Sequence, residues 1–177
     1  MPPFCWPSGR RWHDHLWHRS TGEDGMIICG IDPGLAGAIA WISSEGDALI
    51  CIEDMPVINV NGRNKVNASA LVKLLKDRWA DLVVVEEVGA MPGNGATSMF
   101  NFGYSAGILE GVCAALQVPL RMVRPATWKR QAGVPADKGA CRMMAQRYWP
   151  GANYFGRVKD DGRADAALLA KWGINHV

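Results

Sequence analysis

Short apolar runs and longer stretches of helical spacing divide the chain into predicted strands and helices. Five short runs rich in Ile, Val and Leu predict β-strands, namely 27–32, 36–43, 48–53, 82–85 and 120–123. Tight turns join the first three, which is typical of an antiparallel meander. The run 82–85 is apolar throughout, so we expect that strand to be buried on both faces.

Helical spacing begins after the third strand and alternates with the last two strands. The predicted helices are 68–79 with Asn67 as N-cap, 97–116, 125–130, a helix to Tyr148 capped by Asp137, and 160–172. Residues 55–66 between strand and helix are expected to form a loop. This order predicts an α/β fold, a mixed five-stranded sheet flanked by helices.

Three glycines recur at intervals of four in the predicted helix 97–116. Gly103, Gly107 and Gly111 therefore form one row along its surface. Each costs about 1 kcal/mol of helix propensity relative to Ala. We expect another backbone to approach this row closely, either that of the sheet or that of a second subunit.

Composition indicates a globular protein with one folded domain, residues 26–177, after an extension. Residues 1–25 are rich in Trp and His and lack periodicity, so we expect them to be disordered; the alternative is a metal-binding tract of His13, His15 and His18. No apolar run is long enough to cross a bilayer. The five cysteines are scattered, with no C-x-x-C pair, which favours reduced thiols, no zinc site and a cytoplasmic location.

Positive charge is concentrated late in the chain. Between residues 119 and 147 there are seven basic residues and one acid, Asp137. The basic residues are Arg121, Arg124, Lys129, Arg130, Lys138, Arg142 and Arg147. Such a segment suits a polyanion, although a solvated helix surface gives the same pattern.

Four acids stand at the ends of predicted elements. Asp32 ends the first strand in an Asp-Pro-Gly turn, Glu86 ends the fourth, and Asp161 and Asp165 lie on one face at the start of the last helix. Each has an ordinary structural explanation: a turn cap, a surface ion pair, or a complement to the helix dipole. If the first and fourth strands are neighbours and the last helix packs over them, the four acids converge. Close carboxylates repel one another unless a cation lies among them, so together the acids predict a metal site. Oxygen-only ligation favours Mg²⁺ or Mn²⁺, and two such ions activate water for phosphodiester hydrolysis.

Three motifs occur in order along the chain: Gly30-Ile31-Asp32-Pro33-Gly34, 84–88 around Glu86, and 161–170 with Asp161 and Asp165. Together they resemble the motifs of the RuvC-type Holliday junction resolvases, most of all the short forms of phages and prophages. The resemblance spans roughly residues 26–172. It implies a ribonuclease H-like fold, a homodimer, Mg²⁺ dependence and paired nicking of four-way DNA junctions.

The resemblance also implies roles for individual residues. Asp32, Glu86, Asp161 and Asp165 match the metal-binding acids, and Lys129 and Lys138 match lysines near the scissile phosphate. The Arg-rich stretch would follow DNA backbones, with affinity falling as salt rises. The last two acids are four residues apart rather than three, which leaves Asp160 as an alternative to Asp161. Glu87 is likewise an alternative to Glu86.

The sequence leaves other functions open. The loop after Glu86 offers only Met91 where bacterial resolvases carry an aromatic wedge. A nuclease for flaps or RNA–DNA hybrids would share the fold, and a catalytically silent junction-binding protein would keep the acids for structure. An actin-like ATPase has a similar first hairpin, but it needs two such domains.

Overall fold

The protein is described by a computed structural model, which places residues 25–87, 95–137 and 139–176. The predicted disordered extension, the Met91 loop and Lys138 lie outside these ranges. Cys29, Cys51, Cys113 and Cys141 are free thiols, as expected. In the described ranges, no helix combines the length and apolarity that crossing a membrane requires.

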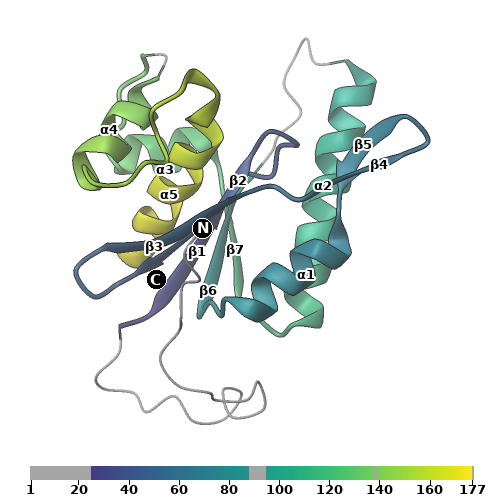
Figure 1. Ribbon diagram of the computed structural model, residues 1–177, viewed down its shortest axis with the longest axis horizontal. Helices are drawn as coiled ribbons and strands as arrows, with labels where there is room; N and C mark the ends of the chain where they lie inside the picture. Colours follow the sequence, from purple (N-terminus) through teal and green to yellow (C-terminus); the bar gives the residue numbers. More distant parts are fainter. Residues whose placement is uncertain (1–24, 88–94, 138, 177) are drawn as a thin grey trace.

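A mixed five-stranded sheet in the order β3-β2-β1-β6-β7 forms the centre of the fold (Figure 1). The strands are β1 (Ile27–Ile31), β2 (Ala38–Ser43), β3 (Ala48–Asp54), β6 (Leu82–Glu86) and β7 (Leu120–Val123). β1 pairs antiparallel with β2 and parallel with β6, and β7 continues the parallel half. The predicted mixed five-stranded sheet is confirmed, and in it the first and fourth predicted strands, β1 and β6, are neighbours.

Helices cover both faces of the sheet (Figure 1). One layer holds α3 (Pro125–Gln131), α4 (Ala140–Tyr148) and α5 (Asp161–Ile174), and the other holds α1 (Ala68–Asp77) and α2 (Ala96–Ala115). Asn67 caps α1 as predicted, by accepting from the Ala70 backbone N–H at 3.1 Å. The N-cap of α4 is Gly139 and not Asp137, whose predicted capping role is therefore wrong.

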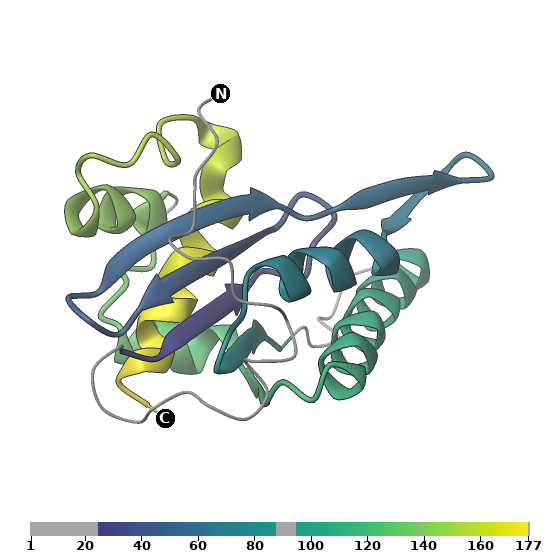
Figure 2. The same cartoon turned by 60° about the horizontal axis from the view of Figure 1, so that its bottom comes forward.

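The predicted loop 55–66 is instead a β-hairpin. β4 (Val57–Val60) and β5 (Arg63–Val66) pair antiparallel, and the ribbon projects beyond the main sheet (Figure 2). Asn61 and Gly62 both have positive φ, 52° and 77°, as a two-residue hairpin turn of the Asn-Gly type requires. The prediction missed it because Val57, Ile58 and Val60 do not alternate cleanly with polar residues.

Close backbone approach occurs at glycines other than the predicted row. A Cβ on Gly103, Gly107 or Gly111 would meet no atom of the described residues within 4 Å, so the sheet does not pack against this row. A Cβ on Gly30 of β1 would lie 2.1 Å from the Ala166 carbonyl oxygen of α5, and one on Gly173 would lie 2.8 Å from Val84. Gly30 and Gly173 thus allow α5 to pack closely against β1 and β6.

Candidate active site

Asp32 and Glu86 leave the sheet side by side. Asp32 directly follows β1 and Glu86 is the last residue of β6, while Ile31 pairs with Val85 in the parallel register. Because both strands run in the same direction, their carboxyl ends meet at one edge. The placement predicted from the strand ends is confirmed for these two residues.

The start of α5 packs onto the turn that carries Asp32. A Cβ on Gly162 would lie 2.9 Å from Asp32 Oδ2 and 2.9 Å from the Ala36 carbonyl oxygen, so only glycine fits there without a shift. This contact brings the first turns of α5 over the edge of the sheet. Asp165, three residues after Gly162 on the same side of the helix, thereby joins the two strand-end acids.

The electrostatics of Asp32 and Glu86 reflect their shared environment. Burial raises the pKa of Asp32 to about 6. The Gly34 backbone N–H, which donates to Asp32 Oδ1 at 3.2 Å, lowers this pKa, and the nearby charge of Asp165 raises it. Burial likewise raises the pKa of Glu86 to about 6, with Asp165 and Asp32 adding to the rise. Three carboxylates thus interact through a poorly solvated space.

Lys129 supplies the positive charge in this space. Its Nζ lies 2.9 Å from Asp165 Oδ2, and both side chains are mostly shielded from solvent. Lys129 also lowers the pKa of both Asp32 and Glu86. Although burial alone would lower the pKa of Lys129, its hydrogen bond to Asp165 raises it. The lysine therefore neutralises part of the acidic cluster from α3.

Asp161 lies beside this cluster. Its Oδ1 accepts from Arg142 Nε at 2.5 Å, and its side chain is 46% exposed. Asp161 and Asp165 line one hollow of about 270 Å³, together with Lys129, Cys141 and residues 134–137. The predicted sharing of one helix face is confirmed, but Asp161 opens toward the solvent side of the site.

The two alternative acids have structural partners. Asp160 is 3% exposed and accepts from the Arg157 side chain and backbone N–H, with Arg163 at 3.6 Å. Glu87 lies 3.5 Å from Arg124, and its own side chain is 43% exposed. Asp161, in contrast, lines the same hollow as Asp165, and Glu86 interacts with both Asp32 and Asp165, so position relative to the other acids favours Asp161 and Glu86 in each pair.

The predicted DNA-binding residues fall into two regions. Arg124, Lys129 and Arg130 belong to α3 or its N-cap, and Arg142 of α4 faces Asp161. Arg121 is at the other end of the sheet, where it donates to the His176 carbonyl and lies over the Trp172 ring. Lys138 is outside the described residues, next to Gly139.

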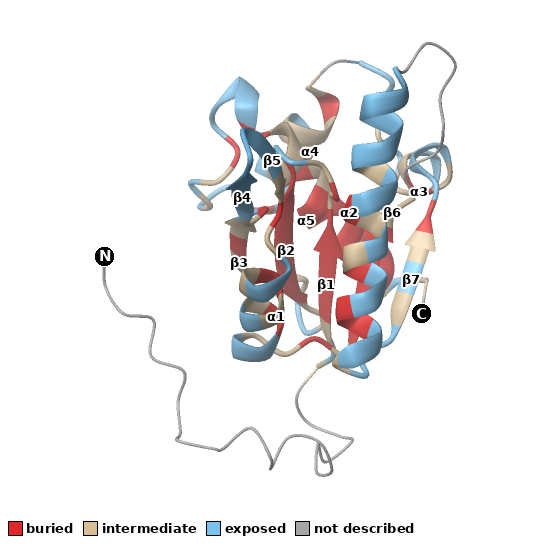
Figure 3. Cartoon of the chain, turned by 90° about the vertical axis from the view of Figure 1, so that its right-hand side faces the viewer, coloured by how far each residue is buried: buried red, intermediate tan, exposed pale blue. Residues whose placement is uncertain are grey.

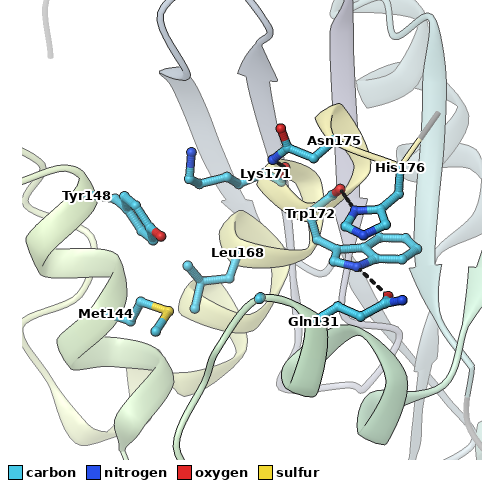
Figure 4. Close-up of a pocket in the computed structure, with 9 residues that line it drawn as sticks. Gln131, Met144, Tyr148, Leu168, Lys171, Trp172, Asn175 and His176 are labelled. Carbon is cyan, nitrogen blue, oxygen red and sulfur yellow. Dashed lines mark hydrogen bonds between the residues drawn. The ribbon is translucent and has the colours of Figure 1, made fainter.

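A cavity of about 170 Å³ marks that far end of α5 (Figure 4). Trp172 stacks on His176 and its Nε1–H donates to Gln131 Oε1 at 3.0 Å, while Lys171 lies under the Tyr148 ring. Lys171 also pairs with Asp47. The bond of Trp172 to Gln131 and the pair of Lys171 with Asp47 thus hold α5 to its neighbours at this cavity.

Sequence reasoning missed two contacts of the site. Trp128 is fully buried and donates from Nε1 to Glu86 Oε1 at 3.2 Å, and Cys141 contacts Asp165. Nothing in the sequence signals the first contact, because Trp128 follows Glu86 by 42 residues. The second would have required knowing that α4 packs on α5.

The acids fit a hard divalent cation by their chemistry. Among the described residues, no three His, Cys, Asp or Glu side chains form a group already spaced to hold an ion. The donors present are carboxylate oxygens, which Mg²⁺ prefers. Burial raises the pKa of two of these carboxyl groups, Asp32 and Glu86. Lys129 stands at Asp165 as a counter-charge. We therefore consider Asp32, Glu86 and Asp165 the candidate ligands, with Asp161 at the margin.

The buried acids predict that the metal-free protein loses stability as pH rises. The folded-state pKa values of Asp32 and Glu86 are about 6, above their ordinary 3.8 and 4.5, so ionising them favours unfolding. Their contribution is most favourable below about pH 4 and is lost as pH rises through 6. We expect a lower melting temperature at pH 7.5 than at pH 5.5, in EDTA, measured by differential scanning calorimetry. The Asp32→Asn variant should show a smaller difference between the two pH values; an equal or larger one would contradict this assignment.

Comparisons with solved structures identify the fold. No protein-family model matches the chain, and no curated protein matches it in sequence. Its structure is similar to Thermus thermophilus RuvC in complex with a Holliday junction, with 20% identity, 83% of this chain and 91% of that chain covered, and a TM-score of 0.63.

Two further resolvases share the arrangement. The fowlpox virus Holliday junction resolvase matches with 18% identity over 86% of this chain and all of that one, at a TM-score of 0.54. The yeast mitochondrial resolvase Ydc2 matches with 16% identity over 94% and 85%, at a TM-score of 0.56. The chain therefore has the RuvC-type resolvase fold, which confirms the ribonuclease H-like fold implied by the sequence motifs.

Proposed function

We propose that this protein is a structure-selective DNA endonuclease that resolves four-way junctions by paired, metal-dependent hydrolysis of phosphodiesters. One observation carries the proposal: Asp32, Glu86 and Asp165 interact at the edge of a RuvC-type sheet, with Lys129 among them. A ligand-free structural role would not require buried Asp32 and Glu86 beside a third acid, Asp165, because burying charges of one sign is costly.

Each residue has a proposed part in the reaction. Asp32, Glu86 and Asp165 would hold Mg²⁺, or Mn²⁺ in its place, and Asp161 would complete the set. When bound, these ions supply a nucleophile from water at neutral pH and neutralise charge on the leaving oxygen. Lys129 would transfer its contact from Asp165 to the scissile phosphate, and Lys138 would approach the same phosphate.

The DNA would lie along the cationic residues nearest the acids. Arg124 and Arg130 belong to α3 or its N-cap, the helix that carries Lys129, and Arg142 of α4 donates to Asp161. Arg142 would exchange Asp161 for a backbone phosphate. Since phosphate contacts release counterions, affinity should fall steeply with added salt. Base-specific contacts are not needed for recognition of a branched shape.

A homodimer would give two active sites for two symmetric nicks. We propose that the exposed face of α2 forms the contact. Figure 3 shows α2 exposed along most of its length. Among its residues 96–115 there is one charged side chain, Glu110, and Phe100 is 70% exposed. No atom of the described residues would lie within 4 Å of a Cβ on Gly103, Gly107 or Gly111, so a second copy could approach this row closely.

The Gly107→Glu variant should therefore be monomeric under conditions where the wild type is a dimer. Burying a charge with no partner costs about 3–5 kcal/mol, which weakens dimerisation on the order of 10²–10⁴-fold. Analytical ultracentrifugation measures the shift. Gly156→Glu, at another open and exposed glycine, is the matched control and should remain dimeric. Equal behaviour of both variants would place the contact elsewhere.

Cleavage of a labelled synthetic four-way junction tests the proposed activity. Flap, linear duplex and RNA–DNA hybrid substrates serve as controls, each with Mg²⁺ and with EDTA. We expect metal-dependent nicks placed symmetrically in opposing strands of the junction. Cutting of flaps or hybrids alone would mean that the metal site is catalytic but acts on another substrate. Tight junction binding without cutting would mean that the protein binds junctions and is not a nuclease.

A further inference from the structure

The buried side chain of Trp128 makes a direct contact with one of the candidate metal ligands. It is fully buried, and its Nε1–H donates to Glu86 Oε1 at 3.2 Å. Glu86 pairs with Val123 at the end of β7, and α3 begins two residues later at Pro125. Because the link between β7 and α3 is this short, the start of α3 lies close to the end of the neighbouring strand β6, within reach of the Trp128 indole.

Close packing fixes the position of the indole. Trp128 belongs to the core cluster between the sheet and the layer of α3, α4 and α5, where side chains have few alternative rotamers. Lys129 Nζ lies 5.1 Å from the Trp128 ring centroid and 2.9 Å from Asp165. Consecutive residues of α3 therefore contact two different acids of the site.

The hydrogen bond distinguishes Glu86 from its neighbour. Glu87 points to Arg124, at a partly exposed position, and its backbone N–H donates to the Val123 carbonyl. The indole donor engages one carboxylate oxygen of Glu86, at 3.2 Å. Because the ring is fixed by the core around it, Trp128 holds the Glu86 carboxylate in one orientation.

We propose that Trp128 is a positioning residue, which fixes the Glu86 carboxylate for metal binding through its indole N–H. This inference rests on the proposed function, since it assumes that Glu86 is a metal ligand. Partners that orient ligands typically account for 10–100-fold in metal affinity or activity. Trp128 itself is fully buried and would contact neither the metal nor the DNA.

The Trp128→Phe variant tests the inference, because it keeps an aromatic ring in the core and removes the N–H donor. We expect Mn²⁺ binding to the DNA-free protein, measured by calorimetry, to weaken 10–100-fold. Junction cleavage should then need more Mg²⁺ for half-maximal rate, while junction binding in EDTA stays unchanged. The double variant with Glu86→Gln should bind Mn²⁺ no more weakly than Glu86→Gln alone.

Trp172→Phe is the matched control. Trp172 is 4% exposed and its Nε1–H also donates to a side-chain oxygen, that of Gln131, at the far end of α5 (Figure 4). The control should lose comparable thermal stability and keep wild-type Mn²⁺ affinity. Wild-type affinity in Trp128→Phe, or an equal loss in Trp172→Phe, would overturn the positioning role.

A measurement on the unmodified chain covers the case in which Trp128→Phe fails to fold. In ¹⁵N spectra with assigned indoles, the Trp128 N–H signal should move on addition of Mg²⁺, and the Trp172 signal should not. An unmoved Trp128 signal in a protein that binds the ion would contradict the inference. A different result would contradict the proposed function alone: the wild type binds Mg²⁺ and the Trp128 N–H signal moves, but no nucleic acid is cut.

Discussion

The Asp32→Asn variant is expected to bind a four-way junction as tightly as the wild type and to leave its strands uncut. Asn keeps the size of Asp and an oxygen for the Gly34 N–H, which donates to Oδ1 at 3.2 Å. It removes the charge that would help to hold a cation. Bound metal ions lower the activation barrier by several kcal/mol, and each 1.36 kcal/mol is tenfold in rate. We therefore expect the cleavage rate to fall on the order of 10³-fold or more.

Single-turnover cleavage and gel-shift assays with the same junction measure the two effects separately. Asp77→Asn is the matched control, because it removes one carboxylate at an exposed pair with Lys73 on α1 and so changes net charge equally. Its cleavage rate should equal that of the wild type. Residual cutting by Asp32→Asn within tenfold of the wild type would remove Asp32 from the catalytic site.

Thermal stability shows whether loss of activity comes from loss of fold. Burial holds the pKa of Asp32 at about 6, so its charge at pH 7.5 opposes folding. The neutral Asn should therefore raise the melting temperature at that pH. A variant that is more stable and inactive would indicate a carboxylate kept for function at a cost in stability.

The sequence predicted the acids of the site from general rules of sheet structure. Asp32 and Glu86 follow short apolar strands, and parallel neighbours must deliver their C-terminal residues to one edge. Asp165 could be included because the last helix begins with acids in a regular spacing. These features depend on local pattern alone, and the structure retains them.

Contacts between distant segments were not accessible in the same way. The bond from Trp128 to Glu86 depends on how α3 folds back from β7, and the pair of Arg142 with Asp161 depends on how α4 packs on α5. Neither leaves a periodic signal. The arginine cluster inferred from composition accordingly divides, with Arg121 held at Trp172 and Arg142 facing the acids.

For the glycine row of α2, the alternative of packing on the sheet was wrong for a related reason, and the alternative of a second subunit stays a prediction. Spacing identifies a row on a helix, but only the fold shows what faces it. The row of α2 meets no neighbour in the part of the chain that the structure describes, whereas Gly30 and Gly162, which belong to no row, lie against backbone. The hairpin turn at Asn61 and Gly62 is different, because its sequence signal was present and was outweighed by poor alternation in β4.

The Gly30→Ala variant is expected to be strongly destabilised. The added Cβ would lie 2.1 Å from the Ala166 carbonyl oxygen and 2.5 Å from the Ala170 backbone nitrogen. These are backbone atoms of a buried helix, so they cannot rotate away as a side chain would. Overpacking of a core costs about 1–3 kcal/mol, and this contact belongs at the upper end of that range. A loss of about 3 kcal/mol corresponds to roughly 6–12 °C in melting temperature for a chain of this size.

Gly34→Ala provides the comparison, since a Cβ there would meet its nearest neighbour, Asp32 Oδ1, at 3.6 Å. Thermal unfolding of this variant should stay within about 0.5 kcal/mol of the wild type, and equal stability of the two alanine variants would contradict the close packing of α5 on β1. The same packing carries Asp165 to Asp32 and Glu86. Because α5 must shift to admit the methyl group, Gly30→Ala should also cleave junctions more slowly at temperatures where it remains folded.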